Sequence, residues 1–332
     1  MRPRPVIVAT VRDAAEVLGS FISYHLAIGF AHIYLFFDDP ADPFADTLAG
    51  HPDVTAMRSD QALRAQWTTL RSYARYRGHI ESEVMARQIL NCELAIRKAA
   101  EAGFDWILHI DSDELFLCAG DSAPELFEAL DFRGARNAAY MNLEALPEQL
   151  QIGDYFREVT LFKVNIRLQG SFRFDQQQLE LIRSTHFADG YVSFHLYDNG
   201  KSAARIDENL VPLSVHEFGR VLPDGSIDQS RQICGDSQVI LHYPNCGLSK
   251  FVSKYQALGS FADKWFGTME VFPFHKEARD VVAQGDAAAI ERLYRDRVMR
   301  NAADDVPLLM ENGILRRIDG PANLLGKIAL RS

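Results

Sequence analysis

The chain has 332 residues, of which 47% are hydrophobic and 24% charged, a composition typical of a globular protein with a large core. It carries 35 Lys and Arg residues against 45 Asp and Glu residues, so its formal net charge is −10. Such an acidic chain lacks the excess of cations that nonspecific binding to nucleic acid requires. Its most apolar stretch, residues 21–37, is too short and too polar for a transmembrane helix. We therefore expect no nucleic-acid partner and no transmembrane segment.

The first elements predict the start of a parallel α/β sheet. Residues 5–11 form a β-branched run typical of a buried strand, and residues 14–28 carry apolar side chains at helical spacing. Residues 32–37 predict a second strand, which ends at a turn signal. Strand, helix and strand with short connections are typical of parallel sheets. A third strand is predicted over residues 52–58, and a polar loop with helical pieces over residues 61–79.

A long helix and an apolar strand follow. The helix is predicted over residues 80–102, which are rich in helix formers and precede Gly103, a typical helix stop. Residues 104–110 predict a strand that ends in the acidic run Asp111-Ser112-Asp113-Glu114. Parallel sheets bind ligands at the carboxyl ends of their strands, so this run is the first candidate site.

The pattern changes beyond residue 131, where short strands alternate with long loops. The predicted strands cover residues 137–143, 157–164, 171–174, 203–206, 213–218 and 239–243. Helices are predicted again over residues 248–265 and 287–300. The whole pattern predicts an α/β fold with a helical C-terminal extension.

The strand-end carboxylates are candidate ligands of a divalent cation. If Ser112 lies in a turn, Asp111 and Asp113 can approach one hard cation, which prefers oxygen ligands and can bridge two phosphates. An arbitrary Asp-x-Asp is more often a capping or solvated turn. Here the run is flanked by apolar residues on both sides, and acidic groups in apolar surroundings are costly without a cation or hydrogen-bond donors. The context therefore favours a cation site.

The segment from Asp105 to Phe116 resembles the core motif of the glycosyltransferase family 92 and family-2-like enzymes, the group also known as domain of unknown function 23. Further blocks resemble that group in the same order. They cover residues 12–16, 23–30, 33–39, 200–202, 215–217 and 241–243, followed by Lys250 and Lys254. The usual Asn-Glu pair after the first strand is replaced by Arg12-Asp13. The matches span about residues 5 to 260 of the chain.

The resemblance implies a GT-A fold, a Rossmann-like mixed sheet flanked by helices, with a divalent metal, manganese (Mn²⁺) or magnesium (Mg²⁺). It places Asp111 near the ribose and the metal, makes Asp113 the direct metal ligand, and matches His242 to a histidine that completes the metal site. Imidazole with carboxylates also favours a transition-type ion over calcium. A buried strand-end histidine is the rival interpretation of His242.

The domain bounds follow from the same resemblance. A catalytic GT-A domain is expected over residues 1–246, and a helical extension over residues 247–332. Within the catalytic domain, residues 1–131 would bind the nucleotide-sugar and residues 132–246 the acceptor.

Several polar residues are candidates for binding the nucleotide-sugar. Arg87 resembles an arginine that faces the nucleotide in other GT-A enzymes. Lys250 and Lys254 lie one helical turn apart, and a lysine can neutralise the leaving diphosphate as a point charge. A solvated helix face is the alternative for each of the three. The full candidate set is Thr10, Arg12, Asp39, Arg87, Asp111, Lys250 and Lys254.

Glu217 is the candidate catalytic base, with His216 beside it. An inverting transfer needs a carboxylate to deprotonate the acceptor hydroxyl, while a metal and cations stabilise the leaving diphosphate. The pair lies between apolar residues on a predicted strand, where polar side chains are unusual unless they serve a site or hydrogen-bond locally. Glu144 and Asp236 are rival candidates for the base.

The predicted function is metal-dependent, inverting transfer of a sugar from a nucleotide-sugar, with a UDP-sugar as first choice, to a glycan or other hydroxyl acceptor. A metal-dependent phosphodiesterase or nucleotidyltransferase and a non-catalytic carbohydrate-binding protein are the alternatives. The sequence has no P-loop or dinucleotide-binding glycine motif. Its four cysteines form no Cys-x-x-Cys pair and suit a reducing compartment. We expect a cytoplasmic protein, with peripheral association with the membrane where the acceptor is made as the other option. The sequence leaves the oligomeric state open.

Overall fold

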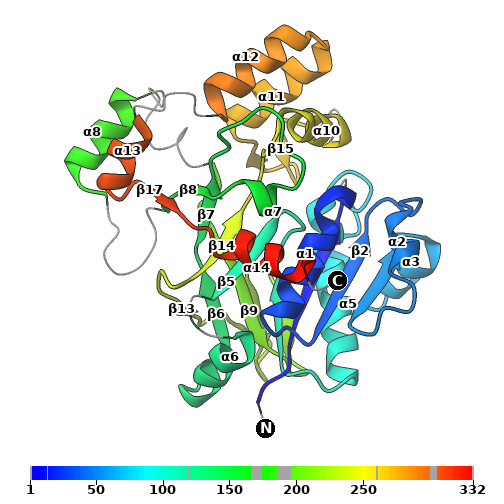
Figure 1. Ribbon diagram of the computed structural model, residues 1–332. Helices are drawn as coiled ribbons and strands as arrows, with labels where there is room; N and C mark the ends of the chain where they lie inside the picture. Colours follow the sequence, from blue (N-terminus) through cyan, green and yellow to red (C-terminus); the bar gives the residue numbers. More distant parts are fainter. Residues whose placement is uncertain are drawn as a thin grey trace. The chain divides into compact units, whose positions relative to one another are not determined.

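The computed structural model describes residues 2–12, 14–118, 120, 122–165, 174–185, 196–258, 261–299 and 305–330. The chain forms two compact units (Figure 1). The first comprises Met1–Met141 and Asn199–Ile240, and the second comprises Asn142–Asp198 and Leu241–Ser332. Among the described residues, no helix is long and apolar enough to cross a membrane.

The described part of the first unit is centred on a seven-stranded mixed sheet with the order β13-β6-β9-β4-β1-β2-β3. Its strands are β1 (Pro5–Val11), β2 (His32–Phe37), β3 (Val54–Arg58), β4 (Trp106–His109), β6 (Asn137–Tyr140), β9 (Lys201–Arg205) and β13 (Gln232–Ile233). β4, β1, β2 and β3 run parallel, whereas β9 is antiparallel to both β4 and β6. The carboxyl ends of the four parallel strands therefore meet at one edge.

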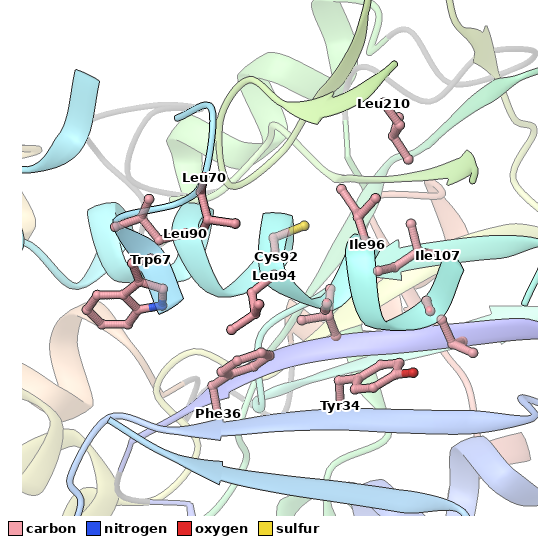
Figure 2. Packing of buried hydrophobic residues seen from close by; sticks show 14 of the residues in the cluster. Tyr34, Phe36, Trp67, Leu70, Leu90, Cys92, Leu94, Ile96, Ile107 and Leu210 are labelled. Atoms are coloured by element: carbon pink, nitrogen blue, oxygen red, sulfur yellow. The ribbon is translucent and has the colours of Figure 1, made fainter. Parts of the chain in front are cut away.

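Helices cover both faces of this sheet. Ile107 of β4 belongs to a buried cluster with Leu90 and Leu94 of α5 (Val84–Glu101) and Trp67 of α3 (Gln61–Trp67). Figure 2 shows side chains of β2 and β4 meeting those of α5. Successive strand residues point to opposite faces. The neighbouring Trp106 accordingly packs against Phe127 of α6 (Ala123–Phe132), with ring centroids 5.1 Å apart.

The remaining elements of the first unit surround the sheet. They are α1 (Ala15–Ala27), α2 (Phe44–Thr47), α4 (Tyr73–Tyr76), β5 (Glu114–Cys118), β10 (Leu210–Pro212), β11 (Phe218–Val221) and β12 (Ile227–Asp228). β10, β11 and β12 form an antiparallel meander. β14 (Gln238–His242) carries the chain from the first unit into the second.

The second unit combines short antiparallel strands with helices. Its strands are β7 (Asn142–Ala145), β8 (Leu161–Lys163), β17 (Leu315–Arg317), β15 (Lys264–Trp265) and β16 (Met269–Glu270). Its helices are α7 (Tyr155–Glu158), α8 (Gln176–Ser184), α10 (Leu248–Leu258), α11 (Pro273–Gln284), α12 (Ala287–Arg297), α13 (Asp305–Glu311) and α14 (Gly320–Ala329). β8 pairs with both β7 and β17. A separate buried cluster joins α10, α11 and α12 through Phe251, Phe274 and Tyr294.

The predicted α/β class, a mixed sheet flanked by helices, is confirmed, as are the strands over residues 5–11 and 32–37. Two predicted elements begin later in the structure than the sequence indicated. The helix over residues 80–102 begins only at Val84, because Glu83 is extended (φ −121°, ψ 114°). The strand predicted from residue 157 begins at Leu161, because the preceding residues form the short helix α7.

Other predicted elements are wrong in kind or shorter. Of the strand predicted over residues 213–218, only Phe218 lies in a strand, β11, and residues 213–217 form a turn closed by the hydrogen bond from Leu213 N to the Glu217 backbone oxygen, 2.9 Å. The helix predicted over residues 248–265 ends at Leu258, and Lys264 begins a hairpin strand. The strand predicted over residues 137–143 is split into β6 and β7. Residues 171–173 of another predicted strand lie outside the described residues, as does residue 300 at the end of the last predicted helix.

Candidate functional site

The acidic run lies in the turn between β4 and β5, at the carboxyl end of a parallel strand. Ser112 and Asp113 occupy the turn, as the cation hypothesis required of Ser112. Glu114 stabilises the turn through two hydrogen bonds with Asp111. The backbone N of Glu114 donates to the backbone oxygen of Asp111 at 3.1 Å, and Glu114 Oε2 accepts from the backbone N of Asp111 at 2.8 Å. The turn is therefore held by the acidic residues themselves.

A buried lysine that the sequence analysis did not single out binds this turn. Lys201 begins β9, and its side chain is 1% exposed. Its Nζ donates to Asp111 Oδ2 at 2.6 Å and to the Val215 oxygen at 3.3 Å, and lies 3.7 Å from Glu114 Oε2. Burial lowers the pKa of Lys201, but the charges of Asp111 and Glu114 outweigh burial and raise the pKa above its usual value. Lys201 therefore carries a positive charge inside the protein.

Helix α5 supplies the second partner of Asp111. Gln88 Nε2 donates to Asp111 Oδ1 at 2.5 Å, so both oxygens of this carboxylate accept a hydrogen bond. His109, at the end of β4, is 3% exposed, and its Nε2 has no hydrogen-bond partner among the described residues. Burial, and then the charge of Lys201, lower the pKa of His109 to about 3. The imidazole is therefore neutral at physiological pH.

Glycine is required immediately before Lys201. Gly200 has φ +67°, and a Cβ at this position would lie 2.1 Å from the Tyr140 oxygen. His216 Nδ1 donates to the Gly200 oxygen at 2.8 Å, and Ser202 Oγ donates to the His216 oxygen at 2.7 Å. The blocks at residues 200–202 and 215–217 are thus joined. A glycine followed by a lysine in a motif block was the signal that could have identified Lys201.

We predict that Gly200→Ala lowers the free energy of unfolding by at least about 3 kcal/mol. The left-handed conformation alone costs an alanine about 1–2 kcal/mol, and the contact with the Tyr140 oxygen forces the strand to shift at further cost. The matched control is Gly225→Ala, because Gly225 also has positive φ (+82°) but a Cβ there meets nothing within 4 Å. Urea denaturation measures both variants. Equal losses would show that the contact with Tyr140 has no effect.

The candidate nucleotide-binding residues at the N-terminal strands have well-defined partners. Thr10, at the end of β1, is 6% exposed and accepts a hydrogen bond from Asn91 Nδ2 of α5 at 3.0 Å. Asp39 Oδ1 accepts from the Ala41 backbone N at 2.8 Å. Thr10 therefore joins strand to helix, and Asp39 stabilises the turn after β2.

Two candidate arginines converge on a carboxylate that the sequence analysis passed over. Arg87 donates from Nε and Nη2 to the two oxygens of Asp38, at 2.5 and 2.8 Å, and from Nη1 to the Ile80 oxygen at 2.6 Å. Arg12 Nη1 reaches Asp38 Oδ2 at 3.3 Å. Asp38 is 6% exposed, so the bidentate pair with Arg87 is largely buried. A ligand of Arg87 would have to compete with Asp38.

The candidate base lies in the turn before β11. The Glu217 carboxylate pairs with Arg231, and both side chains are about 40% exposed. His216 directs Nδ1 to the Gly200 oxygen instead. The two neighbours thus have different partners. The rival base Asp236 lies between β13 and β14.

The rival base Glu144 belongs to the second unit and is 2% exposed. Its Oε1 accepts from Lys163 Nζ at 2.5 Å, and its Oε2 accepts from the backbone N atoms of Leu196 and Tyr197 at 2.8 and 3.1 Å. Through these contacts, Glu144 holds the backbone at Leu196 and Tyr197 in place.

Two of the other candidates, His242 and Lys254, lie against the Tyr197 ring in the second unit. His242, the last residue of β14, meets the Tyr197 ring edge-on with centroids 4.7 Å apart. Lys254 of α10 lies 5.5 Å from the same ring centroid and donates from Nζ to the Pro244 oxygen at 2.8 Å. Lys250 lies one turn earlier on α10. Tyr197 therefore brings the late histidine and the closing lysine together.

The predicted metal ligands come from both units of the chain. Asp111 and Asp113 belong to the first unit, and His242 belongs to the second. Among the residues that the structure describes, no three His, Cys, Asp or Glu side chains are grouped so as to hold a metal ion. The three-ligand site stays a prediction.

Comparison with known proteins gives two similar sequences from Arabidopsis thaliana, both described as glycosyltransferase-like. They are 26% and 25% identical to this chain over 99% of its length. The chain spans 73% of the first relative and 64% of the second. No family model matches the chain.

Solved structures share only low overall similarity with this chain. They include core-mannan synthase A from Aspergillus fumigatus in its Mn/GDP form, with 14% identity over 43% of each chain and a TM-score of 0.26. A mannosyltransferase from S. cerevisiae in complex with GDP has 11% identity over 45% of this chain and 42% of that chain, with a TM-score of 0.24.

Proposed function

We propose that this chain is a glycosyltransferase that moves a sugar from a nucleotide-sugar, with a UDP-sugar as first choice, to a hydroxyl group of a glycan or glycoconjugate. The observation that carries the proposal is the acidic turn of Asp111 and Asp113 at the carboxyl end of parallel strand β4. The resemblance of residues 105–116 to family 92 and family-2-like enzymes supports it. So do the two glycosyltransferase-like relatives, which match 99% of the chain.

The residues of the turn fit a hard divalent cation, because carboxylate oxygens are the donors that Mn²⁺ and Mg²⁺ accept. Asp113 would hold the ion directly, Asp111 would lie beside it and the ribose, and His242 is proposed as a further ligand. A bound cation would neutralise charge that develops on the leaving diphosphate. Binding of the diphosphate and nucleotide, and deprotonation of the acceptor, are assigned to side chains of this chain.

Lys254 is our proposed contact to the diphosphate, with Lys250 as its neighbour on α10. Lys254 Nζ now donates to the Pro244 oxygen, and two further donors of the ammonium group can turn to a phosphate. We propose that the nucleotide is bound by Arg87, Arg12, Thr10 and Asp39.

Glu217 is our proposed general base, with His216 beside it. The base must lie within hydrogen-bond reach of the acceptor hydroxyl that it deprotonates. Because the Glu217–Arg231 pair is about 40% exposed on both sides, an acceptor hydroxyl can reach the Glu217 carboxylate. We propose that the transfer inverts the configuration at the sugar carbon, with Glu217 as the single base that activates the acceptor hydroxyl.

The proposal is tested by following donor turnover directly. A thermal-shift screen of nucleotide-sugars with Mn²⁺, Mg²⁺ or EDTA identifies the donor, because a ligand that binds the native state raises the melting temperature. We expect one nucleotide-sugar to stabilise the protein and to release its nucleoside diphosphate when glycan acceptors are added.

The alternatives give different products from the same reactions. Hydrolysis of the donor to a nucleoside monophosphate and a sugar phosphate would identify a phosphodiesterase. Pyrophosphate from a nucleoside triphosphate and a sugar phosphate would identify a nucleotidyltransferase. Binding of glycans without turnover of any nucleotide-sugar would identify a carbohydrate-binding protein. Each of these results would overturn the proposed transfer.

A further inference from the structure

The acidic turn concentrates negative charge around one buried carboxylate, that of Glu114. Asp111, Asp113 and Glu114 lie within four residues, and the side chain of Glu114 is 3% exposed. Like charges at this spacing repel one another, and a buried carboxylate without a partner is costly. The turn therefore needs a compensating positive charge in order to fold.

Lys201 supplies that charge from within the chain. Its ammonium group lies 2.6 Å from Asp111 Oδ2 and 3.7 Å from Glu114 Oε2, with 1% of the side chain exposed. A lysine on the surface could rotate away, but this one begins a strand that pairs on both sides, with β4 and with β6. The glycine before it allows no larger residue. The positive charge is consequently fixed in place.

The same contacts make Asp111 a poor ligand for a divalent cation. Gln88 and Lys201 each occupy one of its two oxygens, at 2.5 and 2.6 Å. A divalent ion on Asp111 Oδ2 would also lie close to the ammonium group of Lys201, which is buried, and two positive charges at contact distance repel each other.

We propose that Lys201 is a built-in cation of the acidic turn. Its ammonium group holds Asp111 and compensates Glu114, so that the turn folds without metal and metal binding falls to Asp113. Lys201 is then a positioning residue that acts through Asp111. The assignment of metal to Asp113 rests on the proposed function, whereas metal-independent folding of the turn does not.

The test compares stability and metal binding in the parent and in Lys201→Met. Unfolding is followed in urea with EDTA, and Mn²⁺ is then titrated in thermal-shift assays without nucleotide-sugar. We expect the stability of the parent to be the same with and without EDTA. In EDTA, Lys201→Met should be less stable than the parent. Because the repulsion is gone, Mn²⁺ should restore the variant at a concentration at least about tenfold below that which affects the parent.

Two further variants keep the test decisive. The double variant Lys201→Met/Asp111→Asn removes one charge of each sign, and in EDTA it should be more stable than Lys201→Met. It also replaces the single variant in the Mn²⁺ titration if Lys201→Met does not fold. In that case a titration midpoint below that of the parent supports the proposal, and an unchanged midpoint overturns it. Lys264→Met is the control, since Lys264 pairs with Glu270 at the surface, where the side chains are 52% and 65% exposed.

Two results would overturn the proposal. One is a loss of stability of the parent in EDTA that is as large as the loss caused by the Lys201→Met substitution. The other is a Lys201→Met variant with the parent's response to Mn²⁺, which would make Lys201 a purely structural partner. Neither measurement uses sugar transfer, so failure of the proposed function would be seen separately, as absence of nucleoside diphosphate release.

Discussion

Asp113→Asn should reduce sugar transfer at least about 100-fold, the range for losing one electrostatic stabiliser of a transition state. Asn keeps the shape of the side chain but removes the charge that would hold a divalent cation. The fold should survive, because Asp113 lies in a turn with two other acidic residues and the loss of one negative charge relieves repulsion. We therefore expect a catalytic defect with a change in stability within about 1 kcal/mol, as for substitutions away from the core.

The measurement is kcat at saturating donor over a range of Mn²⁺ concentrations. Asp224→Asn is the matched control, because Asp224 also lies in a turn, before β12, where it accepts hydrogen bonds from Ser226. The control should retain the parental rate. If Asp113→Asn keeps the full Mn²⁺-dependent stabilisation by the donor, Asp113 is not the metal ligand.

Lys163→Met is expected to cost the second unit about 3–5 kcal/mol of stability, the range for removing one partner of a buried ion pair. Lys163 and Glu144 are 3% and 2% exposed, and their charged atoms lie 2.5 Å apart. Without the ammonium group, the Glu144 carboxylate would stay buried and lose its cationic partner, while the backbone N–H groups of Leu196 and Tyr197 would remain donors. The loss should also loosen Tyr197, against which His242 packs.

Arg317→Met provides the comparison within the same unit. Arg317 pairs with Glu148, but the side chains are 37% and 42% exposed, and exposed pairs contribute about 1 kcal/mol or less. Urea denaturation of both variants, followed by tryptophan fluorescence and far-UV circular dichroism, measures the difference. Similar losses in the two variants would mean that solvent reaches the Lys163–Glu144 pair after all.

Local sequence patterns predicted the parallel strands of the sheet at whose edge the acidic turn lies. The β-branched run of residues 5–11 and the apolar residues 32–37 became neighbouring parallel strands, because apolar residues of this kind pack well in a sheet that is covered on both faces. The prediction failed for residues 213–217, which form a turn rather than a strand. A pattern of alternating polarity does not reveal that the backbone closes on itself between Leu213 and Glu217.

The candidate site shows the same division. The acidic run could be found because its residues are adjacent, and an apolar strand before it predicts its place at the edge of the sheet. The ion pair between Lys201 and Asp111 could not be predicted, because 90 residues separate the two along the chain. Likewise the bidentate pair of Arg87 with Asp38, 49 residues away, could not be predicted from the sequence.

The sequence by itself determined the class of fold, the position of the acidic turn and the resemblance to glycosyltransferases, since each depends on residues close together along the chain. Only the tertiary structure decided which charges compensate one another. Lys201 meets Asp111 because β9 lies antiparallel beside β4, and Lys163 meets Glu144 because β8 pairs with β7. Strand pairing joins residues that are distant in sequence, and burial then makes each ionic contact strong enough to matter.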